Sequence, residues 1–300
     1  MSARRAEVRV VRAGALTTVQ DAGRPGYAHL GVPRSGALDR PAFAAANRLV
    51  GNGAEAACLE TTVTGCAVRP SRAVLAAVTG AACPVRVDGR PVAWGAPVLV
   101  PAGAVLDVGT AALGLRSYVA FAGGADVPPV LGSRACDLLS GLGPAPLSDG
   151  DVLPLGVDRA GPPGGADVVP CRGLGRELVL PLLPGPRDDW FTPAAERTLA
   201  AGRYEVSARS NRIGLRTSGP RLERAREGEL PSEGMVLGAV QVPPDGCPVV
   251  FLADHPTTGG YPVVGVVPEE ALAAAAQAPP GTPVRFVPLR GRPLPAGSRG

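Results

Sequence analysis

The chain has 300 residues, of which 45% are hydrophobic, 19% are charged and 4% are aromatic, with 41 glycines and 34 prolines. This composition excludes a disordered chain and predicts short strands joined by tight turns, around a core of Val, Leu and Ala. The formal net charge is only +4, without any basic run, so we expect no nucleic-acid partner. No apolar stretch approaches the roughly 18 residues of a spanning helix, so we expect no membrane partner.

Residues that are missing or scarce exclude several kinds of chemistry. All 30 basic residues are arginine, so the chain cannot build a P-loop, form a lysine Schiff base or carry covalent biotin. The only histidines are His29 and His255, which excludes a multi-histidine metal centre, and we expect no metal site. The six cysteines form no C-x-x-C pair and are interpreted as small apolar side chains. The start of the chain lacks an apolar signal core, so a cytoplasmic location is expected.

The first half reads as strands with one helix. Alternation around Val8 and Val10 predicts a strand over 7–12, and apolar runs predict strands over 73–79 and 115–122. Asp39 can cap a helix over 41–50, with Pro in its first turn. Asp88-Gly89 is typical of a two-residue hairpin turn.

The second half repeats this pattern. Strands are predicted over 177–183, 248–253 and 263–267, and helices from Thr192-Pro193 to 201 and from 268 through 276. Asp245-Gly246 resembles the first hairpin turn. The Gly161–Gly165 segment reads as a linker. We therefore predict an N-terminal domain over 1–165, a C-terminal domain over 166–290 and a flexible tail over 291–300.

A faint repeat links the two halves. Arg24–Gly31 and Arg212–Gly219 share the pattern R-x-G-x-x-x-x-G, and a proline follows closely in both. Taken at face value, this predicts two β-domains of the same type.

Three segments place polar residues among glycines. The first spans 17–24 and 35–39, the second spans 210–214, and the third comprises Gln241 and 254–262. Glycines let the backbone approach a ligand, and an arginine can hold a carboxylate or phosphate with two hydrogen bonds. For the first segment an alternative stays open, in which Asp21 and Asp39 only cap turns and helices and Arg24 pairs with one of them.

At these segments the chain resembles the allophanate hydrolase subunit 2 family, also called KipA-like or biotin-dependent carboxyltransferase-like. The resemblance runs from about residue 7 to residue 287. The matching stretches are 16–21, 23–24, 31–33, 35–39, 46–52, 59–60, 79–81, 120–124, 130–133, 184–186, 188–189, Ser210, 212–214, 238–243, 253–254 and 257–262. One departure is Asn211, where the family often has Asp.

The resemblance implies a mostly β fold of two cyclophilin-like β-barrel domains with a few short helices. It also implies that the chain is part of a multi-subunit enzyme. Stand-alone members are typically the C subunit of a bacterial 5-oxoprolinase, which uses ATP, with a KipI-like and a LamB/YcsF-like subunit, to hydrolyse 5-oxo-L-proline to L-glutamate. Such a chain would be inactive alone and would share ATP and Mg²⁺ with its partners.

Two other functions stay open at this point. The chain could be the carboxyltransferase component of a biotin-dependent urea or amide carboxylase, with biotin on a separate carrier. It could also be a non-catalytic, KipA-like partner of a KipI-like protein. Neighbouring genes would distinguish the carboxyltransferase from the 5-oxoprolinase subunit. A biotin carboxylase gene would indicate the former, and a LamB/YcsF-like gene the latter.

The same resemblance, with the residue chemistry, suggests roles for individual side chains. Arg24 or Arg212 would hold the substrate carboxylate or a phosphate, and a carboxylate would handle protons or Mg²⁺. The expected catalytic residues are Asp21, Arg24, Asp39 and Asp254. The expected substrate-binding residues are Gln20, Ser35, Gly36, Arg212, Gln241, Thr257, Thr258, Gly259, Gly260 and Tyr261.

Overall fold

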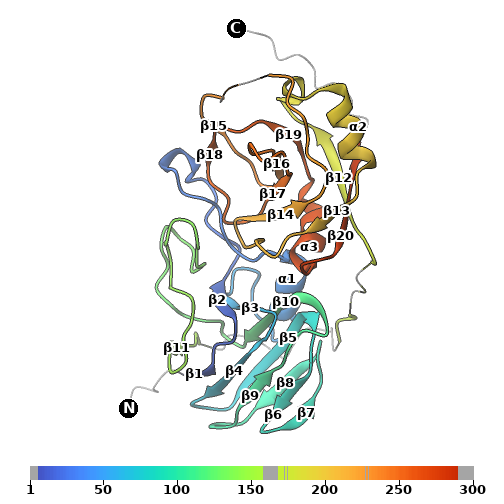
Figure 1. The fold of residues 1–300 in the computed structure, drawn as a ribbon. Helices are drawn as coiled ribbons and strands as arrows, with labels where there is room; N and C mark the ends of the chain where they lie inside the picture. Colours follow the sequence, from blue (N-terminus) through green and yellow to red (C-terminus); the bar gives the residue numbers. More distant parts are fainter. Residues whose placement is uncertain are drawn as a thin grey trace. The chain divides into compact units, whose positions relative to one another are not determined.

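The computed structural model describes residues 6–157, 168–171, 173, 175–226, 228 and 230–289. The chain divides into two compact units, Met1–Leu174 and Gly175–Gly300 (Figure 1). The predicted linker Gly161–Gly165 and the predicted tail over 291–300 lie outside the described residues. The domain boundary after residue 165 therefore stays a prediction.

The first unit contains two antiparallel sheets. The six-stranded sheet has the order β11-β1-β4-β9-β6-β7 and the five-stranded sheet the order β2-β3-β10-β5-β8. The strands are β1 Glu7–Arg12, β2 Leu16–Gln20, β3 Cys58–Thr62, β4 Cys66–Pro70, β5 Val74–Ala82, β6 Val85–Val87, β7 Arg90–Val92, β8 Pro97–Val100, β9 Leu106–Val108, β10 Leu113–Phe121 and β11 Val152–Pro154, and the helices are the 3₁₀ turn η1 Ala28–Leu30 and α1 Arg40–Leu49.

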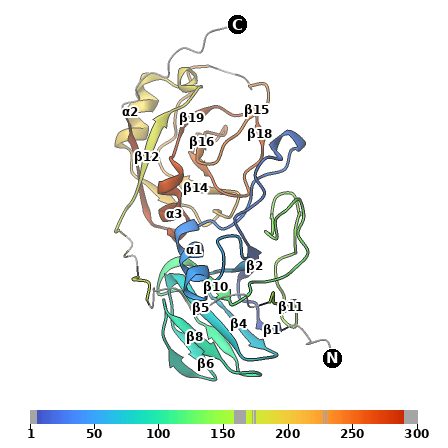
Figure 2. The ribbon, with the colours of Figure 1, turned by 180° about the vertical axis from the view of Figure 1, so that it is seen from behind.

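The five-stranded sheet is buried on both faces. On β10, Val119 and Phe121 belong to the core that the two sheets share, whereas Tyr118 and Ala120 belong to a second core. The second core also contains Phe43 of α1, which lies against β5 and β10 (Figure 2). Because successive strand residues point to opposite faces, one strand contributes to both cores. Each large apolar side chain buried in this way contributes about 1.5–3 kcal/mol.

The local signals of the first unit are confirmed. Asp39 Oδ1 accepts a hydrogen bond of 3.0 Å from the Ala42 amide, so α1 begins beside its predicted cap. Asp88 and Gly89 have φ angles of +47° and +77°, as a type I′ turn requires, and they join β6 to β7.

The second unit is a closed barrel with the strand order β12-β19-β16-β17-β14-β13-β20. Among the described strands of this unit, only β12 and β20 pair in parallel, and β15 and β18 form a separate ribbon. The strands are β12 Leu178–Pro184, β13 Tyr204–Val206, β14 Gly214–Ser218, β15 Glu233–Gly234, β16 Ala239–Gln241, β17 Val249–Phe251, β18 Thr258–Gly259, β19 Val263–Val266 and β20 Pro283–Pro288, and the helices are η2 Asp188–Trp190, α2 Pro193–Ala201 and α3 Glu269–Gln277.

The predicted fold class, mostly β with a few short helices, is confirmed by these elements. Helix α2 begins after Thr192, whose hydroxyl accepts from the Ala195 amide at 3.1 Å. Barrel closure is found in the second unit, whereas the strands of the first unit form the two separate sheets given above.

One local prediction was wrong. Seven residues, 242–248, separate β16 from β17, so Asp245-Gly246 lies in a longer loop and is not a two-residue turn. The two copies of the repeat differ in local structure, since Arg24–Gly31 contains turns and η1 whereas Arg212–Gly219 contains β14. Pro25 and Gly26, which has a φ of +96°, prevent a strand in the first copy, whereas buried and exposed residues alternate in the second.

No helix among the described residues has the length and apolar character needed to cross a membrane.

None of the six cysteines, all within the described residues, forms a disulfide, and Cys58, Cys66, Cys83 and Cys136 are buried. Burial raises the pKa of the Cys66 thiol to about 12, which strongly disfavours its thiolate. The interpretation of the buried cysteines as apolar side chains agrees with these environments.

Candidate functional site

Polar side chains gather on the α1-facing side of the five-stranded sheet, on β2, β3 and β10. Thr18, Glu60 and Tyr118 lie side by side in the strand register and are each at most 1% exposed. Gln20, two residues along β2, is fully buried and donates 3.0 Å hydrogen bonds to Thr18 Oγ1 and to the Cys136 carbonyl. Polar groups buried this deeply are destabilising unless they are hydrogen-bonded. Their hydrogen-bond partners therefore show which backbone segments these side chains hold in place.

Glu60 and Tyr118 hold the backbone just before α1. Glu60 Oε2 accepts from the Tyr118 hydroxyl at 2.8 Å and from the Leu38 amide at 3.0 Å. The Tyr118 oxygen in turn accepts from the Asp39 amide at 2.7 Å. Burial, followed by the nearby Glu60 and Asp39 charges, raises the pKa of Tyr118 well above its ordinary value, so the hydroxyl remains a donor.

Two loops cover this polar layer, the first loop (residues 21–39) and the second loop (residues 130–143). Asp21 joins them, because its carboxylate accepts from Gly23 N at 2.8 Å, from Ser133 Oγ at 2.6 Å and from Arg134 N at 2.5 Å. An aspartate with three hydrogen bonds fixes the relative position of both loops.

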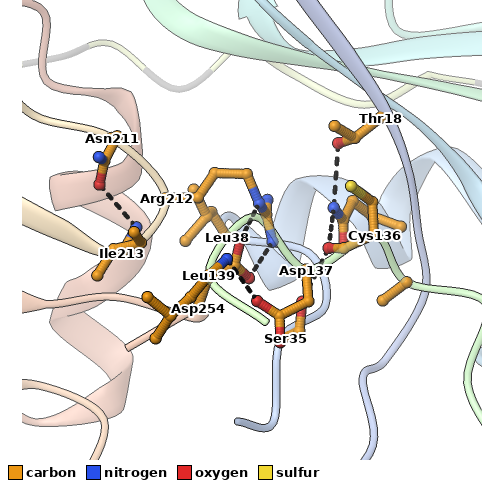
Figure 3. A network of polar contacts seen from close by, with 12 residues as sticks. Thr18, Ser35, Leu38, Cys136, Asp137, Leu139, Asn211, Arg212, Ile213 and Asp254 are labelled. Atoms are coloured by element: carbon orange, nitrogen blue, oxygen red, sulfur yellow. Dashed lines mark hydrogen bonds and ion pairs between the residues drawn. The ribbon is translucent and has the colours of Figure 1, made fainter. Parts of the chain in front are cut away.

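Ser35 and Gly36 form a tight turn in the first loop. Ser35 has a φ of +54°, and its hydroxyl donates to the Cys136 carbonyl at 2.9 Å (Figure 3). Gly36 has a φ of +91°, and a Cβ atom there would lie 2.8 Å from Gly23 N. Non-glycine residues rarely adopt such backbone, so the turn is held by its surroundings.

Arg24 is 1% exposed and reaches the second loop with its guanidinium group. Its Nη2 donates to the Ala135 carbonyl and its Nε to Val130 O at 3.4 Å. Its Nη1 lies 4.0 Å from Asp137 Oδ2. The Asp137 carboxylate compensates the guanidinium charge, but this distance is too long for a hydrogen bond. Asp137 caps its own turn, accepting from Leu139 N at 2.9 Å and from Ser140 Oγ at 2.5 Å.

In the second unit, Arg212 and Asp254 form a buried bidentate pair (Figure 3). Arg212 Nε donates to Asp254 Oδ2 at 2.9 Å and Nη2 to Oδ1 at 3.0 Å, and both side chains are at most 1% exposed. Asn211 Oδ1 accepts from the Ile213 amide at 2.9 Å, so the departure from the family pattern falls on a residue that shapes a turn.

The remaining candidates of the second unit lie around the β15–β18 ribbon. Gln241 Nε2 donates to the Tyr261 carbonyl at 3.2 Å, and a Cβ on Gly259 would lie 2.8 Å from that nitrogen. Arg224 lies over the Tyr261 ring, 5.9 Å from its centroid. The His255 ring stacks on the Phe251 ring, with 5.8 Å between the two ring centroids.

The structure thus brings the sequence candidates together in groups. In the first unit, Gln20 and Ser35 meet at Cys136, and Asp21 and Arg24 both bind the second loop. In the second unit the Arg212–Asp254 pair is one group, and Gln241 with the 257–261 segment is another. The catalytic and substrate-binding roles of these residues stay predictions, and several of them also have a structural role.

Sequence reasoning missed four residues of the first-unit cluster: Glu60, Tyr118, Cys136 and Asp137. A signal existed for Glu60, a carboxylate within the strand sequence Cys-Leu-Glu-Thr-Thr, where a lone charge implies a buried partner. No comparable signal marks Cys136, which contributes its backbone carbonyl.

The Gly36 turn gives a testable prediction. We expect Gly36→Ala to lower the free energy of unfolding by roughly 3 kcal/mol or more, because a Cβ would meet three backbone atoms at 2.8–3.0 Å. Gly31→Ala is the matched control, since Gly31 also has a positive φ, +76°, but open space around it, and we expect a loss of about 1 kcal/mol. Urea denaturation of both variants measures the difference, and equal losses would contradict the close packing of the Gly36 turn against residues 21–23 of the same loop.

Comparison with known proteins identifies the family. The model of the carboxyltransferase domain, subdomain A and B, matches residues 30–288. The chain therefore belongs to this carboxyltransferase domain family, and the family resemblance seen in the sequence is confirmed.

The similar proteins include one of about the same length and two longer chains with crystal structures. The chain is 40% identical to the C subunit of 5-oxoprolinase from Escherichia coli (strain K12) over 286 residues, covering 93% of this chain and 90% of that protein. The crystal structure of TTHA0988 has a TM-score of 0.86 and 39% identity, over 95% of this chain but only 56% of that one. The crystal structure of the K. lactis urea amidolyase has a TM-score of 0.87 and 30% identity, over 96% of this chain and 19% of that one.

Proposed function

We propose that this chain is the C subunit of a bacterial-type 5-oxoprolinase, which hydrolyses 5-oxo-L-proline to L-glutamate with ATP. One observation supports this more than any other: the similarity to the Escherichia coli C subunit covers nine tenths of both proteins. The similarity to the TTHA0988 and urea amidolyase chains covers only 56% and 19% of those chains. The proposed partners are a KipI-like and a LamB/YcsF-like subunit, without which the chain would be inactive. We place this ATP-consuming complex in the cytoplasm.

The nucleotide and its Mg²⁺ fit this chain poorly. The sequence has no lysine for a P-loop, and the described residues contain no group of three or more His, Cys, Asp or Glu side chains that could hold a metal ion. We therefore propose that the partner subunits supply most of both sites. The contribution of this chain is to bind and orient the amide substrate.

Of the two buried arginines that the sequence singled out, Arg24 is the better candidate for contact with a substrate oxygen. The fork of Arg212 is occupied by both oxygens of Asp254, whereas Arg24 Nη1 has its nearest carboxylate oxygen at 4.0 Å. We retain Asp21, Asp39 and Asp254 as the proposed proton-handling residues. Asp21 lies in the Arg24 cluster itself, which makes it the first of the three to test.

A second function is favoured by the urea amidolyase similarity. The chain could be the carboxyltransferase component of a biotin-dependent urea or amide carboxylase. Biotin would then arrive on another polypeptide, since this chain has no lysine to carry it.

The test is co-expression of this chain with its KipI-like and LamB/YcsF-like neighbours, followed by an assay for glutamate released from 5-oxo-L-proline. We expect release that requires ATP and that stops when this chain is omitted. A stable complex that releases no glutamate, but accepts carboxyl groups from a biotinylated carrier onto urea, would establish the second function instead. A complex inactive in both assays would favour the KipA-like binding role.

A further inference from the structure

Four buried side-chain atoms among the described residues make no hydrogen bond, and two of them, Gln20 Oε1 and Arg24 Nη1, belong to side chains that reach the second loop. Of the other two, Arg116 Nε lies 3.8 Å from Glu60 Oε1 in an ion pair, and the Tyr204 hydroxyl belongs to the second unit. Gln20 Oε1 is an acceptor and Arg24 Nη1 is a donor. Buried polar atoms are rarely left in this state, and such exceptions call for an explanation. Gln20 and Arg24 are also residues that the sequence had already singled out, whereas Arg116 and Tyr204 are not.

The orientation of the Gln20 amide is fixed by its surroundings. Its nitrogen donates to the Cys136 carbonyl at 3.0 Å and to Thr18 Oγ1 at 3.0 Å. Exchanging the amide oxygen and nitrogen would place two oxygens against each other at Cys136, so the unpartnered atom is the oxygen.

The acceptor and the donor belong to one cluster. Gln20 binds the carbonyl of Cys136, and Arg24 binds the carbonyl of the preceding residue, Ala135. Consecutive Cα atoms are about 3.8 Å apart, so the two head groups are attached to neighbouring points of the same segment.

The charge of Arg24 is already compensated. Asp137 Oδ2 lies 4.0 Å from Nη1, and both side chains are fully buried. The group that accepts from Nη1 therefore does not need a negative charge, and a neutral carbonyl oxygen suffices.

We propose that Gln20 and Arg24 together bind the reacting amide of the substrate, an inference that rests on the proposed function. The amide N–H donates to Gln20 Oε1, and the amide carbonyl accepts from Arg24 Nη1. A lactam or a urea presents its N–H and C=O on the same edge, whereas a trans peptide bond presents them on opposite sides. The subsite thus selects lactams and ureas over linear secondary amides. The guanidinium also stabilises negative charge that develops on the carbonyl oxygen.

The covering loops must separate to admit such a ligand, because both atoms are buried. The first and second loops are joined by side-chain hydrogen bonds, chiefly those of Asp21 and Ser35, and not by strand pairing. Opening them breaks a small number of contacts and leaves the sheets intact.

The test compares 5-oxo-L-proline with its lactone, 5-oxotetrahydrofuran-2-carboxylate, in which a ring oxygen replaces N–H at nearly the same size. Calorimetric titration is carried out with the full chain, alone and in complex with its partner subunits. We expect the lactam to bind about ten- to a hundredfold more tightly than the lactone, because the lactone leaves Gln20 Oε1 unpaired. Gln20→Met should abolish this preference, whereas the matched control Gln277→Met, at a buried glutamine of α3, should retain it.

The outcomes separate this proposal from the proposed function. A preference for lactam that persists in Gln20→Met overturns the subsite, even if the complex releases glutamate. Equal binding of lactam and lactone by the unmodified chain also overturns the subsite. This comparison needs no variant, so the proposal remains testable if Gln20→Met does not fold. Binding of urea or 2-pyrrolidinone that depends on Gln20, without turnover of 5-oxo-L-proline, supports the subsite and overturns the proposed function.

Discussion

Arg24→Lys is expected to reduce ATP-dependent hydrolysis by the reconstituted complex on the order of a hundredfold or more. Lysine keeps the positive charge but has a single nitrogen at the end of its chain. Arg24 uses three nitrogens at once, Nε toward Val130, Nη2 toward Ala135 and Nη1 toward the proposed substrate oxygen. A lysine nitrogen that remained with the Ala135 carbonyl would be lost to the substrate.

The measurement is kcat/KM for glutamate release, together with the denaturation midpoint of each variant. Arg187→Lys is the matched control, because Arg187 also binds a carboxylate, that of Glu233, but lies in the second unit and is about one third exposed. We expect the control to change activity less than threefold, since partly exposed ion pairs contribute little. Activity of Arg24→Lys close to that of the unmodified complex would remove Arg24 from the site.

The regular elements were predictable because their signals are local. Asp39 before Pro41 is enough to begin α1, and Asp88-Gly89 is enough to close a hairpin, since each depends on a few neighbouring residues. The repeat, by contrast, carries little information about local structure. Arg24 and Arg212 share a pattern of residue types, but Pro25-Gly26 forms a turn after Arg24, whereas a strand follows Arg212.

The site was predicted only in part, because its contacts are long-range. Glycines and polar residues identified the first loop, but its partner carbonyls at Ala135 and Cys136 lie more than 100 residues away. Backbone carbonyls carry no mark in a sequence, so these partners could not be foreseen. The alternative structural interpretation also had merit, since Asp39 does cap α1 and Arg24 does lie near a carboxylate, although that carboxylate belongs to Asp137.

Asp254→Asn is expected to destabilise the second unit by about 3–5 kcal/mol, because it leaves the Arg212 charge buried without its bidentate partner. The two units of the chain need not unfold together, so the measurement requires a reporter for the second. The chain has two tryptophans, Trp94 in the first unit and Trp190 in the second. In a Trp94→Phe background, urea denaturation followed by tryptophan fluorescence reports on the second unit alone.

The double variant Arg212→Met with Asp254→Leu separates stability from chemistry. Replacing both charges with apolar side chains of similar volume removes the desolvation cost of the pair, so most of the lost stability should return. If Asp254 handles a proton, the stable double variant is still inactive in the glutamate assay, by a factor of about a hundred or more. If the pair only holds the barrel together, activity returns with stability. Recovery of both would leave Asp21 and Asp39 as the carboxylates to examine, and Asp21 comes first because it lies in the Arg24 cluster.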